Sequence, residues 1–274
     1  MDSNPLLAKV ASAPPRAGRT SDYKVFLWSV IALIGLAWLI LATWSYSPYG
    51  RYLKHDQLGE LAFDAGANAI LLSAGLYLCG WVLMTVAMML PTTLPLLAIF
   101  RRLTAQRTDR TRLVGLLITG YLAIWSLFGI AAHVADWLLH ETVERIAWLE
   151  LNAWVIGAAI FLLAGLFQFS RLKYRCLEKC RTPLTFVTEH WRGRHDNSNA
   201  LMLGVRHGLF CVGCCWALML LMFAIGVGNL GWMLILGALM AIEKNMPWGR
   251  KISAPLGIAL IAFAVFTVFK SLLF

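Results

Sequence analysis

Long stretches without a single charged residue constrain this chain more than any other feature. Six of them cover at least 18 consecutive positions each. They are residues 25–44, 69–100, 113–135, 151–170, 208–242 and 252–269. A helix that spans a membrane needs about 20 mostly apolar residues, so each stretch has the length expected of a membrane segment. The sequence therefore predicts helices embedded in a lipid bilayer.

The composition agrees with this prediction. Hydrophobic residues make up 59% of the 274 positions and charged residues only 14%, whereas a soluble domain typically carries about 25% charged residues. The mean hydropathy is +0.69. Such a chain cannot cover itself with a hydrated surface. A soluble enzyme, a disordered regulator and a secreted module held together by disulfides are therefore excluded.

The fifth stretch is too long for one crossing, because a single helix over residues 208–242 would measure roughly 52 Å. Gly226, Gly228, Asn229 and Gly231 offer a natural break within it. We therefore expect an all-α fold, a polytopic membrane helical bundle with seven hydrophobic segments. The fifth and sixth segments are expected to form a tight hairpin.

The positive charges predict the orientation. Twenty of the 24 Lys and Arg residues lie before the first segment or in the loops after the second, fourth and sixth segments. Because basic residues collect in cytoplasmic loops, we expect a multi-pass protein of the cell (inner) membrane with its N-terminus in the cytoplasm and its C-terminus outside. Topology then explains the net charge of +10, and no nucleic-acid partner is expected. Residues 1–24 are expected to form a disordered cytoplasmic tail, and residues 25–274 a single transmembrane domain.

Sulfur-containing residues gather on the fifth segment. At about 100° per residue, one face of its helix holds an imidazole, three thiols and a thioether. These residues are His207, Cys211, Cys214, Cys215 and Met222, with Met219 at the edge of the face. Clustered thiols on the reducing cytoplasmic side are more often metal ligands or redox groups than structural disulfides. The alternative is that these cysteines are small apolar residues that pack well beside glycine.

A second pair of thiols precedes this segment. Cys176 and Cys180 are four residues apart, so they share one helical face if the fourth segment continues as a helix past Ser170. Positive neighbours such as Arg175 and Lys179 favour the thiolate form. We expect these two thiolates to form a metal-binding pair, here called the clip, at the cytoplasmic entrance, or mouth, of the bundle. The alternative is a pair of reduced thiols without a function.

Methionines and one carboxylate complete the candidate set. Met84 and Met88 share a face of the second segment, and Met219 lies at a comparable depth in the fifth, so a methionine pair across the bundle is possible. Ordinary core packing is the alternative. Glu243 closes an apolar run and is expected within the membrane, where ionisable residues are costly and often functional. Its alternative role is to pair with Lys244 or to reach the interface.

Three stretches of this sequence resemble a known family, namely residues 81–95, 172–183 and 206–244. The most specific match is Gly-x-x-Cys-x-Gly-Cys-Cys-Trp at residues 208–216. The chain resembles, over roughly residues 70–270, a bacterial family of uncharacterised, predicted metal-binding integral membrane proteins. The resemblance implies a family pattern that includes Met84, Met88, Met89, Pro91, Cys176, Cys180, Cys211, Cys214, Cys215, Met219 and Glu243. Gly228 departs from this pattern, since a methionine is expected before Asn229.

Thiolate and thioether ligands select Cu(I). We therefore expect an integral membrane protein that binds a soft transition metal, Cu(I), for metal handling or transfer at the cytoplasmic side. Cys176 and Cys180 would form the mouth, the thiols of the fifth segment the main site and the methionines deeper relay points, with His207 as a ligand or a supporting residue. Zn(II) is the rival metal. The expected partners are the lipid bilayer and a cytoplasmic metal donor or acceptor.

Two other functions stay open at this point. Cys211 and Cys214 have the Cys-x-x-Cys spacing of a thiol oxidoreductase. An assembly or scaffold subunit would use the sulfur-lined face only to pack against another span, in a homo- or hetero-oligomer. No other enzymatic role is supported, because the sequence contains no phosphate loop, Gly-x-Ser-x-Gly or HExxH motif.

Overall fold

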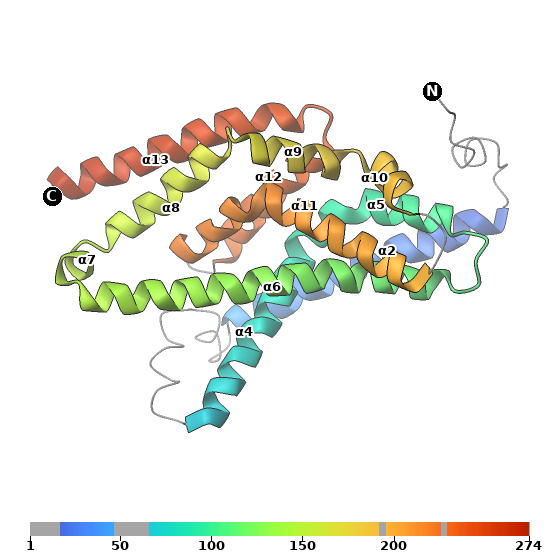
Figure 1. The fold of residues 1–274 in the computed structure, drawn as a ribbon, viewed down its shortest axis with the longest axis horizontal. Coiled ribbons are helices and arrows are strands. Elements are labelled where there is room, and N and C mark those ends of the chain that lie inside the picture. Colours follow the sequence, from blue (N-terminus) through green and yellow to red (C-terminus); the bar gives the residue numbers. More distant parts are fainter. Residues whose placement is uncertain (1–16, 47–65, 192–195, 226–228, 274) are drawn as a thin grey trace.

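The computed structural model describes residues 17–46, 66–191, 196–225 and 229–273, and every element in these ranges is a helix. The helices are α2 (Ala17–Tyr46), α4 (Gly66–Met88), α5 (Leu90–Leu103), α6 (Arg110–Arg145), α7 (Ala147–Leu151), α8 (Trp154–Phe167), α9 (Arg171–Arg181), α10 (Pro183–His190), α11 (Asp196–Ile225), α12 (Leu230–Asn245), the 3-10 turn η2 (Gly249–Ile252) and α13 (Ser253–Leu273). The all-α fold is confirmed. Figure 1 shows α6 running along the length of the molecule, with α8 and α13 side by side toward one end.

Among the residues that the structure describes, four helices are long and apolar enough to cross a membrane. The qualifying stretches are Lys24–Ser45, Arg110–Arg145, Asp196–Met222 and Gly249–Leu273. Two bent pairs of helices, α4 with α5 and α8 with α9, raise the number to six if each pair is one span. Helix α12 has 16 residues, which is about 24 Å and shorter than the roughly 30 Å hydrocarbon core. Seven spanning segments are therefore not confirmed.

Two sequence expectations concern regions at the edge of what the structure describes. Helix α11 ends at Ile225 and α12 begins at Leu230, so the helix breaks where the glycines predict, although residues 226–228 themselves lie outside the described residues. Helix α2 begins at Ala17. The last part of the expected tail is thus helical, and residues 1–16 lie outside the described residues.

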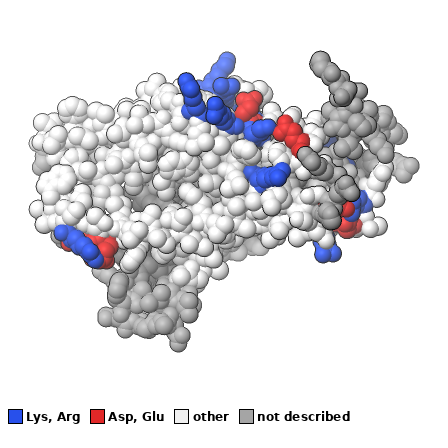
Figure 2. Space-filling model, in the orientation of Figure 1, with Lys and Arg blue, Asp and Glu red and all other residues white. Residues whose placement is uncertain are grey.

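The surface of the bundle is rich in apolar side chains. Trp28, Leu127 and Phe266 are each more than 60% exposed. Figure 2 shows charged side chains gathered over the middle and the right of the visible face, and a blue-and-red group near the lower left, with broad uncharged areas elsewhere. Such extensive exposed apolar surface is unusual for a soluble monomer and is compatible with a lipid environment.

Helices α6 and α11 approach each other so closely that only glycine fits between their backbones. A Cβ atom on Gly204 of α11 would collide with the carbonyl oxygen of Leu117, and one on Gly120 of α6 would collide with that of Leu201. Gly208 continues the contact beside Tyr121, where a Cβ would lie 3.2 Å from a carbonyl oxygen. This close approach brings the buried face of α11 against the side chains of α6.

The bend between α4 and α5 has a covalent cause. Pro91 has no N–H to donate to the carbonyl of Ala87, and the axes of the two helices differ by 65°. The indole N–H of Trp38 on α2 donates to the freed Ala87 carbonyl at 3.2 Å. The bend therefore also links α2 to the rest of the bundle, and it turns Met89 out of the regular helical pattern.

We predict that Gly204→Ala destabilises the protein by about 1–3 kcal/mol, the cost typical of overpacking, because its new methyl group meets the Leu117 backbone. Gly115→Ala on α6 is the matched control, since a Cβ there meets nothing within 4 Å and alanine favours helix by about 1 kcal/mol over glycine. Thermal unfolding in detergent measures both changes. Equal stability of the two variants would contradict the close contact.

Candidate metal site

The thiols of α11 point into the bundle. Cys211, Cys214 and Cys215 are 0%, 1% and 1% exposed, and Met219 and Met222 on the same helix are fully buried. The Cys214 and Cys215 thiols donate to the carbonyl oxygen of Cys211 at 3.0 and 2.9 Å. The sulfur-lined face is therefore part of the core and is not directed toward the surroundings.

Helix α9 brings a fourth thiol to this group. The fourth segment does not continue straight past Ser170, because α8 and α9 meet at 63° and Ser170 caps α9 by accepting from the Lys173 N–H at 3.1 Å. After this bend α9 packs along α11, and the Cys180 thiol lies beside the thiols of Cys211 and Cys214. All six cysteines are free thiols.

Cys176 also faces α11, one turn before Cys180. A Cβ on Gly213 would lie 2.7 Å from the Cys176 sulfur, so the missing side chain of Gly213 makes the space that this thiol occupies. Both thiols of the expected clip therefore lie against the cysteine helix. Cys180 is partly exposed, which places it between the core and the surface.

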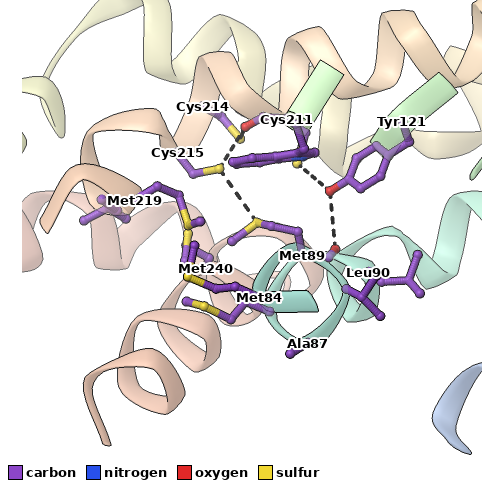
Figure 3. Close-up of a cluster of buried hydrophobic side chains, with 14 of the residues drawn as sticks. Met84, Ala87, Met89, Leu90, Tyr121, Cys211, Cys214, Cys215, Met219 and Met240 are labelled. Atoms are coloured by element: carbon purple, nitrogen blue, oxygen red, sulfur yellow. Dashed lines mark hydrogen bonds between the residues drawn. The ribbon is translucent and has the colours of Figure 1, made fainter. Parts of the chain in front are cut away.

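The Met89 thioether lies beside the thiols. Its sulfur lies 4.0 Å from the sulfur of Cys215, and Figure 3 shows it between Cys215 and the hydroxyl of Tyr121. A helical wheel drawn straight through the second segment turns Met89 away from Met84. The wheel is misleading here because α4 ends at Met88 and α5 begins at Leu90, which leaves Met89 at the corner.

The other candidate methionines lie around this corner. Figure 3 shows Met84, Met219 and Met240 grouped on the side of Met89 that faces away from Tyr121. Met88 packs instead against Gly237 of α12, where a Cβ would lie 3.5 Å from its Cγ. All four are buried. Roles for Met84, Met88 and Met219 as metal ligands stay predictions.

Lys244 is the side chain that the sequence analysis missed. It was assigned to a cytoplasmic loop, yet it is 5% exposed and its ammonium group donates to the Cys211 sulfur at 3.0 Å and to the Thr92 hydroxyl at 3.4 Å. The sulfurs of Cys215 and Met89 lie 3.7 and 3.9 Å from the same nitrogen. The signal was present in the sequence, since Lys244 follows Met240 by four residues and shares its helical face.

Tyr121 and His207 support the thiols from the side of α6. The Tyr121 hydroxyl lies 3.1 Å from the Cys211 sulfur and donates weakly to the Met89 carbonyl at 3.5 Å. The His207 ring stacks on Tyr121 at 5.7 Å and meets Phe186 edge-on. Its Nδ1 is buried without a hydrogen-bond partner among the described residues. His207 thus lies behind Tyr121, and its role as a ligand stays a prediction.

Glu243 has a partner other than the one considered from the sequence. Its carboxylate accepts from Lys173 at 2.7 and 2.9 Å and from the Ser253 hydroxyl at 2.7 Å. Lys173 is fully buried and also donates to Gln168. Consecutive helical residues point about 100° apart, so Glu243 and Lys244 engage different neighbours. A pair between Glu243 and Lys244 is therefore wrong, and metal binding by Glu243 stays a prediction.

The donor chemistry of the cluster fits a soft cation. The buried thiols of Cys211 and Cys215 lie near the Met89 thioether, and thiolate and thioether ligands suit Cu(I). Two sulfurs that each bind one ion at about 2.3 Å are at most about 4.6 Å apart, and the 4.0 Å between Cys215 and Met89 satisfies this limit. Among the described residues, no three His, Cys, Asp or Glu side chains form a ready-made metal site.

A family model for a copper chaperone family, PpoB2, matches residues 78–267, which is well over half of the chain. The chain belongs to the PpoB2 copper chaperone family. The matched range contains the bend at Met89, the four thiols of the cluster and Lys244. No curated protein and no solved structure matches the chain. Family membership supports copper handling and agrees with the metal-binding part of the resemblance noted from the sequence.

The ion pair of Lys173 and Glu243 yields a stability prediction. Lys173→Met leaves the Glu243 carboxylate buried without its cation, which costs about 3–5 kcal/mol of folding free energy. We expect Lys173→Met/Glu243→Met to recover part of this loss, because no unpaired charge remains. Thermal unfolding in detergent measures both.

The matched control is Lys179→Met on the same helix. Lys179 pairs with Glu189 at 2.9 Å with both side chains about 40% exposed, and exposed pairs contribute about 1 kcal/mol or less. If Lys173→Met were no more destabilising than Lys179→Met, the buried pair would not hold α9 to α12.

Proposed function

We propose that this protein is an integral membrane copper chaperone that binds Cu(I) in the buried sulfur cluster and exchanges it with a cytoplasmic partner. The observation that carries the proposal is the proximity of the buried Cys211, Cys214 and Cys215 thiols to the Met89 thioether, whose sulfur lies 4.0 Å from that of Cys215, with Cys180 beside them. They come from α9, from α11 and from the corner between α4 and α5. A set of soft donors from three separate parts of the chain is difficult to explain by helix packing alone.

The chemistry of these donors favours Cu(I) over harder ions. The cluster itself contains no carboxylate, and the nearby Glu243 carboxylate is held by Lys173 and Ser253. Carboxylate and water suit Mg and Mn, whereas thiolate and thioether select Cu(I). Zn(II) also accepts cysteine ligands, so it is the metal against which copper must be compared.

The partly exposed Cys180 supports exchange with a partner. It lies on α9, whose outer face carries the exposed Arg171 and Arg175, while its thiol reaches the buried Cys211 and Cys214. A soft ion passed from thiol to thiol would cross from the surface to the core in one step at this residue. Basic residues at the entrance favour a partner with an acidic surface.

A membrane location is supported by the exposed apolar surface and by the candidate spans. The excess of basic residues in alternate loops supports a cytoplasmic N-terminus and an external C-terminus. In this orientation α6 would run from Arg110 inside to Arg145 outside, and α9 would lie at the cytoplasmic side.

The thiol oxidoreductase alternative has no structural observation in its favour, because Cys211 and Cys214 are almost fully buried and a thiol must be accessible to exchange with a disulfide. The scaffold alternative likewise has none, because the sulfur-lined face packs inside this chain.

The first test is metal binding by the detergent-purified protein, loaded with Cu(I) under reducing conditions. We expect Cys211→Ser/Cys214→Ser to retain at least about tenfold less copper per chain than the wild type, since the loss of even a residue that orients a ligand lowers metal affinity about 10-fold or more. Copper and zinc are counted together by elemental mass spectrometry. Cys79→Ser is the matched control, because Cys79 is exposed and lies outside the cluster. Equal copper in the wild type and the double variant would refute the proposed site.

The orientation has its own test in a Cys79→Ser background. A cysteine introduced at the exposed Glu144, beyond the end of the α6 span, should react with a membrane-impermeant maleimide in intact cells. A cysteine at the exposed Arg175 on α9 should react only after the membrane is opened. The reverse pattern would place the thiol mouth on the outer side.

A further inference from the structure

The positive charge of Lys244 is enclosed by the same sulfurs that form the candidate metal site. Its ammonium group is 3.0 Å from the sulfur of Cys211, 3.7 Å from that of Cys215 and 3.9 Å from that of Met89. The one other described contact is Thr92, whose oxygen lies 3.4 Å away. A buried ammonium group is costly unless negative charge lies beside it.

The nearest carboxylate does not supply that charge. Glu243 precedes Lys244 in α12, but its two oxygens are engaged by Lys173 and Ser253. The polar groups that face Lys244 from α5, α6 and α11 are Thr92, the Tyr121 hydroxyl beside Cys211, and the cysteine thiols. The cysteine sulfurs are therefore the groups that can balance the charge of Lys244 when they are thiolates.

We propose that Lys244 makes this sulfur site selective for a monovalent soft cation over a divalent one. The inference rests on the proposed function, because it concerns the ion held by the same sulfurs. An ion in contact with Cys211, Cys215 and Met89 lies within a few ångströms of the Lys244 ammonium group. In a buried site this repulsion is only weakly screened, and it doubles when the charge of the ion doubles.

Charge balance leads to the same conclusion. Cysteines bind metal as thiolates, so a monovalent ion with two thiolates carries one net negative charge, which Lys244 neutralises. A divalent ion with the same two thiolates is neutral, and the charge of Lys244 is then left without compensation. The monovalent ion therefore needs one thiolate fewer than the divalent ion to reach the same balance, and each further thiolate is costly because the Cys214 and Cys215 thiols both donate to the Cys211 carbonyl. Lys244 is therefore a specificity-determining residue that acts by its fixed charge.

The experiment compares ions that differ in charge and share a closed electron shell. The full-length protein in detergent is offered Cu(I) against Zn(II), and separately Ag(I) against Cd(II), under reducing conditions. We expect Lys244→Met to lower the preference for the monovalent ion at least about tenfold in both pairs, because at an effective dielectric constant of about 20 a unit charge at this distance is worth more than one decade in binding. Lys244→Arg keeps the charge, so its preference for the monovalent ion should stay within about threefold of the wild-type preference. A tenfold change in this preference corresponds to about 1.4 kcal/mol.

A purely structural role for Lys244 predicts a different result. If the residue only holds α12 against Thr92, its loss weakens all four ions equally and leaves both ratios unchanged. Lys251→Met is the matched control, because it removes one exposed positive charge at a position outside the cluster, and it should leave the ratios as in the wild type. Unchanged ratios in Lys244→Met would overturn the inference.

Lys244→Gln keeps the experiment decisive if the methionine variant fails to fold. Glutamine retains a hydrogen-bond donor for Thr92 and the sulfurs but removes the charge, so it should lower the monovalent preference as the methionine does. A wild type that binds none of the four ions refutes the proposed function itself. A wild type that binds copper, with the same ratios in Lys244→Gln, refutes the role of Lys244 alone.

Discussion

The contact between the backbones of α6 and α11 is the constraint on which the candidate site depends. Gly120 and Gly204 permit this approach, since a Cβ at either position would collide with a carbonyl oxygen of the facing helix. Where helices embedded in lipid gain little from the hydrophobic effect, close packing of small residues is a main source of their association. The contact places Tyr121 beside Cys211 and His207 behind Tyr121, so the two glycines influence the geometry around the thiols through the side chains that they bring close.

Two bends then complete the cluster. One turns Met89 toward Cys215 at the corner of α4 and α5, and the other lays α9 along α11 so that Cys180 reaches the α11 thiols. Each bend has a local chemical cause, the missing N–H of Pro91 in the first and the capping hydroxyl of Ser170 in the second. Straight helices would leave these sulfurs on separate faces of the bundle.

The sequence predicted the parts of this structure that follow from local periodicity. Uncharged runs indicated the helices, the glycines near residue 228 indicated the break between α11 and α12, and the spacing of Cys211, Cys214 and Cys215 placed them on one face. Local periodicity did not place Met89 or Lys244 beside the thiols, because a helical wheel assumes a straight axis and a charge after an apolar run resembles a loop residue. Those two positions depend on contacts between helices that are distant in the sequence. The same holds for the Glu243 partner, Lys173, which is 70 residues away.

Adjacent residues of α12 are fastened to different neighbours, Glu243 to α9 and α13 and Lys244 to the sulfurs and α5. With both sides held, α12 is not free to rotate about its own axis. A displacement of Lys244 away from the sulfurs would therefore also disturb the ion pair between Glu243 and Lys173 of α9. Helix α9 presents Cys180 and the basic surface. Helix α12 therefore couples the buried sulfur cluster to the surface of α9, where a partner protein would dock.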